Sequence, residues 1–160
     1  MTMKIALKNG RVASEDTITL LESALGGEMS SSVKAFLRAN DGANPEPNVF
    51  KIAERNESGV NRFIPADQIL KERGFIENIA ERSYPVAFAE GGNYVVVDEA
   101  EGGATLFWDH ELPEELTWLA SSFGAFLELL EPFNIQELEL KREQVKKAWI
   151  DPTFFKNLKK

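Results

Sequence analysis

Residues 85–110 read PVAFAEGGNYVVVDEAEGGATLFWDH and carry the clearest indication of the fold. It contains three short apolar runs, at residues 85–89, 94–97 and 105–108, which are rich in Val, Tyr, Phe and Trp. These residue types favour a pleated, buried backbone. Two glycine pairs, at 91–92 and 102–103, separate the runs and supply the positive φ angles that tight hairpin turns need. The stretch therefore predicts an antiparallel meander of three strands.

The middle run differs from the other two because it is apolar at every position from Tyr94 to Val97. A strand with one face in water alternates apolar and polar side chains, whereas a strand covered on both faces does not. We therefore expect residues 94–97 to form an interior strand of the sheet.

Two amphipathic helices are expected before the meander. The first begins after the capping residue Ser14 and ends at the glycine pair 26–27. The second begins after one of the serines at 30–32 and stops near Asn40. The residues expected to face the core are Ile18, Leu21 and Leu25 in the first helix and Val33, Phe36 and Leu37 in the second.

Between these helices and the meander the sequence predicts short, irregular elements. Residues 44–48 contain two prolines and are expected to form a loop. Strands are expected at residues 49–53 and 60–64, joined by a polar turn over residues 54–59. Pro65 suits the first position of a helix, so residues 65–73 are expected to be helical.

The segment after the meander is expected to be helical. Residues 112–117 contain Pro113 and two glutamates, which are typical of a helix start. Residues 118–131 then show a helical period that ends at Pro132. The apolar stripe of this expected helix consists of Leu119, Phe123, Phe126, Leu127 and Leu130.

The composition limits the class of protein. A chain of 160 residues with 43% hydrophobic and 28% charged residues is typical of one globular domain. It contains no cysteine, which excludes disulfides, thiolate metal sites and a cysteine nucleophile. No stretch approaches the ~20 apolar residues of a membrane span, and the first residues lack a secretory apolar region. We therefore expect a soluble, cytoplasmic protein with no membrane partner. The sequence does not indicate its oligomeric state.

Charge is distributed unevenly along the chain. The formal net charge is −8, yet residues 83–140 contain twelve Asp or Glu and no Lys or Arg. Residues 141–160 carry seven basic and two acidic side chains, a net charge of +5. We expect one domain over residues 1–140 and a basic extension over 141–160 that docks on it through Trp149, Phe154 and Phe155. An acidic domain is a poor candidate for binding nucleic acid, which requires a basic surface.

Several short motifs follow one another in a characteristic order. FLRANDG at residues 36–42 closes the second helix, and VAFA at 86–89 is followed by GGNY at 91–94. LFWDH at 106–110 then precedes LASSF at 119–123. In this order and spacing, the motifs resemble the SUKH superfamily, in the branch similar to the fungal cell-wall-synthesis regulator, over about residues 14–131.

The resemblance implies both a fold and a kind of function. The implied fold is a single α+β domain whose mostly antiparallel sheet has helices packed against it. Bacterial members are implied to be immunity proteins, each of which neutralises a polymorphic toxin that is often a nuclease or a nucleic-acid deaminase. The fungal member is implied to be a regulatory protein that works through protein–protein contacts. The superfamily has no agreed catalytic residues to transfer to this chain.

The chain offers few candidates for catalysis. Residues 109–111 read Asp-His-Glu and contain the only histidine, which suggests a metal or acid–base site. Neighbouring side chains on a strand point to opposite faces, so a strand end with local backbone hydrogen bonds is the more frequent structure of such a motif. The carboxylate pairs 98–99 and 114–115 are merely adjacent in sequence, and phosphate-binding loops and a nucleophile elbow are absent. We expect no enzyme, no metal and no cofactor.

The acidic segment has two explanations. Solubility alone, with the basic extension folded over the segment, requires no partner. Recognition requires a basic protein partner, and a nuclease toxin has a basic active face because it binds phosphate. We hypothesise that such a toxin domain binds the acidic face; a cytoplasmic regulatory or scaffold module with a cellular protein partner is the alternative. The residues expected to lie together on this face are Glu90, Asp98, Glu99, Glu101, Asp109, Glu111, Glu114 and Glu115.

Overall fold

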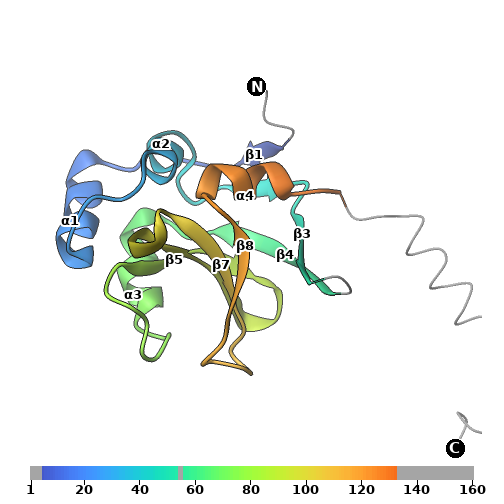
Figure 1. The fold of residues 1–160 in the computed structure, drawn as a ribbon. Helices are drawn as coiled ribbons and strands as arrows, with labels where there is room; N and C mark the ends of the chain where they lie inside the picture. The colour runs from blue at the N-terminus through green and yellow to red at the C-terminus, as the bar shows by residue number, and fades with distance from the viewer. Residues whose placement is uncertain (1–4, 54–55, 133–160) are drawn as a thin grey trace, which may run out of the picture.

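The computed structural model of the protein describes residues 5–53 and 56–132. The expectations for residues 141–160, including the docking of Trp149, Phe154 and Phe155, lie outside these residues. Figure 1 shows an α+β fold in which helices pack against a curved antiparallel sheet. The expected fold class is confirmed. None of the helices within the described residues has the length and apolarity that crossing a bilayer requires.

The sheet has six strands in the order β3-β4-β5-β6-β7-β8, so every strand is hydrogen-bonded to its neighbours in sequence. Antiparallel strands that follow one another need only short connections, which suits a chain rich in turns. The strands are β3 (Val49–Ala53), β4 (Asn56–Phe63), β5 (Ser83–Ala89), β6 (Asn93–Asp98), β7 (Ala104–Trp108) and β8 (Leu116–Ala120).

The predicted meander is confirmed as β5, β6 and β7. Strand β6 lies between the other two, and its residues Val95, Val96 and Val97 are buried, as expected of an interior strand. The two connections are the short 3-10 turns η2 (Glu90–Gly92) and η3 (Glu99–Glu101). All four glycines at residues 91–92 and 102–103 have positive φ angles, between 69° and 86°, where a side chain would be strained.

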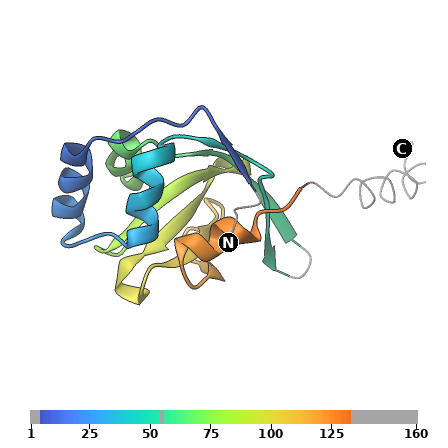
Figure 2. The same cartoon turned by 90° about the horizontal axis from the view of Figure 1, so that it is seen from above.

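Helices α2 (Ser31–Asn40) and α4 (Phe123–Leu129) lie across one face of the sheet, and α1 (Glu15–Leu25) lies beside α2 (Figures 1 and 2). The predicted start of α1 is confirmed, because the Ser14 hydroxyl accepts a hydrogen bond from the Thr17 N–H at 3.1 Å. Gly26 ends this helix with a φ of 79°. The six residues expected to face the core from α1 and α2 are buried: Ile18, Leu21, Leu25, Val33, Phe36 and Leu37.

Aromatic side chains join the helices to the sheet. Phe36 of α2 contacts Phe63 of β4, with ring centroids 4.6 Å apart. Phe126 of α4 contacts Phe50 of β3 at 5.3 Å, and Phe50 contacts Phe107 of β7 at 5.9 Å. Such edge-on and tilted pairs contribute beyond the burial of their area. The core therefore lies between the sheet and helices α2 and α4.

The opposite face of the sheet is covered in part by α3 (Ile69–Arg73) and the segment around it. Trp108 follows Phe107 along β7 and therefore points to this second face, where it packs against Tyr94 with ring centroids 5.6 Å apart. The Tyr94 hydroxyl donates a hydrogen bond to Glu72 of α3 at 2.6 Å. Burial and the Glu72 carboxylate raise the pKa of Tyr94 well above its usual value, so the hydroxyl remains protonated.

The expectation of a helix from residue 112 to residue 131 is wrong in its first half. Residues 116–120 form strand β8, which pairs with β7 so that Leu116 lies opposite Trp108. Helix α4 begins only at Phe123, after the Ser122 hydroxyl has accepted a hydrogen bond from the Ala125 N–H at 3.0 Å. Leu119 belongs to a strand and the later apolar residues belong to a helix, and all of them are buried. Their spacing in the sequence is nevertheless that of the apolar face of a single helix. Pairing with β7 outweighs this local pattern.

Two expectations between residues 44 and 59 are also corrected, and a third, the helix at 65–73, is refined. The expected loop at 44–48 contains β2 (Asn44–Glu46), which pairs with β1 (Ala6–Lys8) in a separate two-stranded sheet. The expected turn at 54–59 is mostly strand, because β4 begins at Asn56. The expected helix at 65–73 begins as the 3-10 turn η1 (Ala66–Gln68) after Pro65. The partner of β2 lies far away in sequence, whereas the polar start of β4 pairs with β3 next to it, with Asn56 opposite Ala53.

Asp41 is expected to lower stability at neutral pH. Its side chain is buried and accepts a hydrogen bond from the Ala66 N–H at 2.6 Å, and burial raises the pKa of its carboxyl above the ordinary 3.8. A pKa raised in the folded state means that ionisation disfavours folding as the pH rises above 3.8. Asp41→Asn keeps the acceptor oxygen and removes the charge, so it should raise the free energy of unfolding at pH 7. Urea melts should show this gain shrinking as the pH falls toward 3.8; a gain independent of pH would contradict the assignment.

Candidate functional site

The structure separates the expected acidic face into two groups at opposite ends of the sheet. Strand β6 runs from Asn93, which pairs with Ala89, to Asp98, which pairs with Ser83. At ~3.4 Å per residue these strand ends are roughly 17 Å apart. Glu90 lies at the first end, together with the segment 109–115, because Trp108 pairs with Tyr94. Asp98, Glu99 and Glu101 lie at the second end, so the eight carboxylates do not form one patch.

Glu99 is part of the internal structure at the second end. Its carboxylate accepts hydrogen bonds from the Ser30 N–H at 2.8 Å and from the Tyr84 hydroxyl at 2.6 Å. Tyr84 is fully buried, and burial together with the Glu99 carboxylate raises its pKa far above the usual range. Neighbouring Asp98 accepts a hydrogen bond from the Ala100 N–H at 3.0 Å. These two side chains hold the turn and the start of α2.

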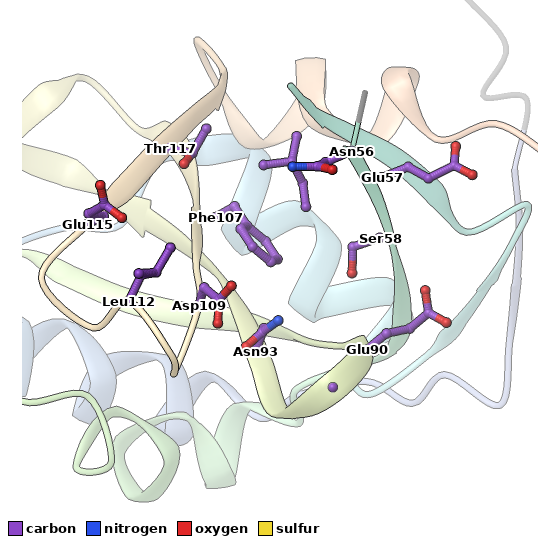
Figure 3. A pocket seen from close by; sticks show the side chains of 12 residues that line it. Asn56, Glu57, Ser58, Glu90, Asn93, Phe107, Asp109, Leu112, Glu115 and Thr117 are labelled. Atoms are coloured by element: carbon purple, nitrogen blue, oxygen red, sulfur yellow. The ribbon is translucent and has the colours of Figure 1, made fainter. Parts of the chain in front are cut away.

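A hollow of about 550 Å³ lies at the first end, between β3 and β4 on one side and β7 and β8 on the other (Figure 3). We call it the acidic hollow, because four carboxylates line it: Glu57, Glu90, Asp109 and Glu115. They come from β4, from the η2 turn and from the loop between β7 and β8. Among the described residues, no Lys or Arg lines the hollow. The hollow is also lined by Phe107, Ser58, Asn93 and Thr117.

Three of the expected residues therefore line the acidic hollow, namely Glu90, Asp109 and Glu115. Glu111 is exposed in the same loop but does not line it, and Glu114 lines a smaller hollow of about 260 Å³ beside Trp108 and Leu116. Glu57 was missed because it falls in the expected turn at 54–59. The hairpin of β3 and β4 was expected, but β4 begins already at Asn56, opposite Ala53, so Glu57 lies in the strand and not in the turn.

The loop side of the acidic hollow is fixed by hydrogen bonds. Asp109 accepts one from the Glu111 N–H at 2.8 Å, and Asn93 accepts one from the His110 N–H at 3.0 Å. The His110 ring nitrogen Nδ1 lies 2.8 Å from the same Asn93 oxygen. The interpretation of residues 109–111 as a strand end with local backbone hydrogen bonds is confirmed. Within residues 5–53 and 56–132, no three His, Asp or Glu side chains are grouped to hold a metal ion.

Glu90 lies over the backbone of β4 because Gly59 leaves room for it. A Cβ on Gly59 would stand 3.0 Å from the Glu90 oxygen Oε1 and 3.0 Å from the Asn48 nitrogen Nδ2. Most side-chain contacts are longer, so any larger residue at position 59 would displace the carboxylate. A glycine in a strand interior often marks such a close approach.

A family model, described as the SMI1 / KNR4 family (SUKH-1), matches residues 12–129 of the chain. The match begins just before α1 and ends at the last residue of α4, so it includes every strand of the six-stranded sheet. No curated protein matches the chain detectably.

Proposed function

Since the chain belongs to the SMI1 / KNR4 family (SUKH-1), we propose that it is an immunity-type binding protein whose acidic hollow contacts a basic toxin domain. The toxin is a protein that acts on nucleic acid, and the immunity protein covers its basic face. Neutralisation by contact requires no chemical step from this chain. The family assignment and the acidic concavity together support the proposal.

The observation that carries the proposal is the charge of the acidic hollow. Four residues with carboxylates line the hollow and no described Lys or Arg does: Asp109 and Glu115 lie on its loop side, and Glu57 and Glu90 lie on its β4 side, where they also line a second hollow of about 300 Å³. A concave surface lined by charge of one sign concentrates the electrostatic field and accelerates the approach of an oppositely charged partner. A nuclease or deaminase has that opposite charge where it binds phosphate, so blocking this face also blocks the toxin's substrate.

Neutralising the acidic hollow should slow the association with the toxin domain. The hollow variant carries four substitutions, and its control carries four at exposed glutamates outside the hollow, so that both change the net charge equally. Association is measured by stopped flow at low and high salt with the toxin domain that a neighbouring gene encodes. The hollow variant is E57Q, E90Q, D109N and E115Q, and the control variant is E77Q, E81Q, E101Q and E128Q.

We expect the hollow variant to associate about tenfold or more slowly than wild type at low salt, because steering charges act mainly on the association rate. Added salt should slow wild type and leave the hollow variant less affected. Cells that produce the toxin domain should survive with the control variant and not with the hollow variant. Equal rates and equal protection for both variants would remove the acidic hollow from the mechanism.

The regulatory or scaffold alternative has a different outcome in the same cells. A scaffold module would give no protection even as wild type, and it would co-purify with a cellular protein whether or not a toxin domain is present. That result would keep the family assignment and reject the immunity function.

A further inference from the structure

A groove lies where the described chain ends, between the C-terminal end of α4 and the turn that joins β2 to β3. Its volume is about 830 Å³, and we call it the α4 groove. Two prolines and a leucine give it an apolar part, and three glutamates also line it. These residues are Pro47, Leu129, Pro132, Glu46, Glu128 and Glu131.

Backbone hydrogen bonds fix the shape of the α4 groove. The Glu131 N–H donates to the Val49 carbonyl at 2.8 Å, and the Glu131 carbonyl accepts from the Val49 N–H at 3.1 Å. This pair holds the residues that follow α4 against the start of β3. The groove is therefore already formed by the domain, so an occupant does not have to order it.

The α4 groove leaves apolar surface uncovered within the described residues. Leu129 is 50% exposed, whereas Phe126, one turn earlier in α4, is completely buried. Pro132 is also exposed. Single exposed apolar side chains are common on protein surfaces. A leucine and two prolines around one concave surface, however, form a site that the apolar side chains of another segment would cover.

The charge of the α4 groove is negative, and none of the described residues that line it is Lys or Arg. Glu46 pairs with Lys8, and Glu131 pairs with Lys51 at 3.9 Å. Both pairs are exposed, and exposed pairs contribute little free energy, so they do not commit the two glutamates to these lysines. The groove therefore suits a segment that is both apolar and basic.

Residues 141–160 of this chain have that composition. They read KREQVKKAWIDPTFFKNLKK, with seven basic, two acidic and three aromatic side chains. Residues 1–140 contain 11 basic and 24 acidic side chains, a net charge of −13, so the two parts of the chain attract each other. Covering Trp149, Phe154 and Phe155 would remove a large apolar area from water.

The basic extension also starts close to the α4 groove. Only residues 133–140 separate it from Pro132, and a segment of this length spans up to roughly 26–29 Å. That span is enough for the extension to turn back onto the groove. A short tether gives the extension an effective concentration on the order of millimolar, which a second copy of the chain or another protein in solution rarely reaches.

We infer that residues 141–160 occupy the α4 groove of their own chain. Their aromatic side chains cover Leu129 and the two prolines, and their lysines lie beside Glu128 and Glu131. This inference does not depend on the proposed function. It gives the basic extension a definite place on the domain, which its composition alone does not.

The test uses the full chain, which contains no cysteine, so Thr153→Cys provides a single attachment site for a nitroxide spin label. The nitroxide broadens the amide signals of residues that it approaches in the ¹⁵N-labelled chain. We expect the signals of residues 46, 48 and 128–131 to be lost and to return when the nitroxide is reduced. Loss at residues 116–118 instead, where Trp118 is 60% exposed, would overturn the inference, and so would no loss among the described residues.

Two sets of substitutions in the spin-labelled chain show whether docking, and not the tether alone, brings the label close. W149S, F154S and F155S together should restore the signals of residues 46 and 48, because they remove the apolar contacts. E128K with E131K should also restore them, whereas the control E101K with E111K changes the net charge equally at exposed positions outside the groove and should not. Equal broadening in the groove variant and its control, or no recovery without the aromatics, would overturn the inference.

A mixture identifies the occupant. Spin-labelled chain without ¹⁵N is added to ¹⁵N-labelled wild type, so that only contact between two molecules can broaden a signal. We expect the signals of residues 46, 48 and 128–131 to remain. Their loss in the mixture would show that a second copy of the chain fills the α4 groove, and the assignment of the chain's own extension would then be wrong.

Discussion

Replacing Phe126 with alanine should lower the free energy of unfolding by about 3–5 kcal/mol, the usual cost of truncating a buried aromatic residue. Phe126 is completely buried at the centre of α4, where it contacts Phe50 at 5.3 Å and Phe123 at 6.4 Å. Alanine would leave a cavity between the helix and the sheet that neither Phe50 nor Phe123 can fill without leaving its own position. Urea denaturation followed by circular dichroism measures the loss.

The matched control lies on the same helix. Leu129 is 50% exposed, so Leu129→Ala removes an apolar side chain from α4 without opening a cavity and should cost less than about 1 kcal/mol. A loss below about 1 kcal/mol for Phe126→Ala, or equal losses for both variants, would show that α4 does not pack on the sheet as described.

The elements that were predictable from the sequence are those with local causes. The meander β5–β7 follows from apolar runs between glycines that adopt positive φ angles. Helix α1 follows from a cap at Ser14, an apolar face and a stop at Gly26. In each case the residues that determine the element lie within it or next to it. No knowledge of distant partners was needed.

The elements that were missed depend on a partner strand outside their own residues. Strand β2 exists because residues 44–46 meet residues 6–8, and its proline-containing sequence reads as a loop in isolation. Strand β8 exists because β7 offers it an edge, and Trp118 remains 60% exposed on that strand. Leu119 and Phe123 are spaced like residues on one face of a helix only by coincidence, because Leu119 lies in a strand and Phe123 in a helix. The local sequence pattern cannot distinguish a strand from a loop or helix at these positions, because the strand is stabilised by pairing with another strand.

The same limit applies to the candidate site. The excess of carboxylates in residues 83–140 was visible, and Glu90, Asp109 and Glu115 do lie around one hollow. The position of each carboxylate relative to the others depends on strand direction, which puts Asp98 at the far end of β6. Glu57 lines the hollow because β4 pairs with β3, and β3 contacts β8. The charge pattern therefore predicted that this surface is acidic, but the order and direction of the strands determine which acidic residues line the hollow.

Glu99→Ala should lower the free energy of unfolding by about 2–3 kcal/mol, because it leaves buried hydrogen-bond donors without an acceptor. The donors are the hydroxyl of the fully buried Tyr84, at 2.6 Å, and the Ser30 N–H before α2, at 2.8 Å. The loss is measured in urea at pH 7, where the exposed neighbour Glu101→Ala should change stability by less than about 0.5 kcal/mol.

A second substitution shows whether the Tyr84 hydroxyl is the cause. Tyr84→Phe removes that hydroxyl, so Glu99→Ala should cost at least about 1 kcal/mol less in the Tyr84→Phe protein than in wild type. Additive losses would mean that the hydrogen bond between Glu99 and Tyr84 contributes little. Folded Glu99→Gln should also associate with the toxin domain as fast as wild type, since Glu99 lies at the end of the sheet opposite the acidic hollow. A slower association with unchanged stability would return Glu99 to the partner-binding face that its sequence position suggested.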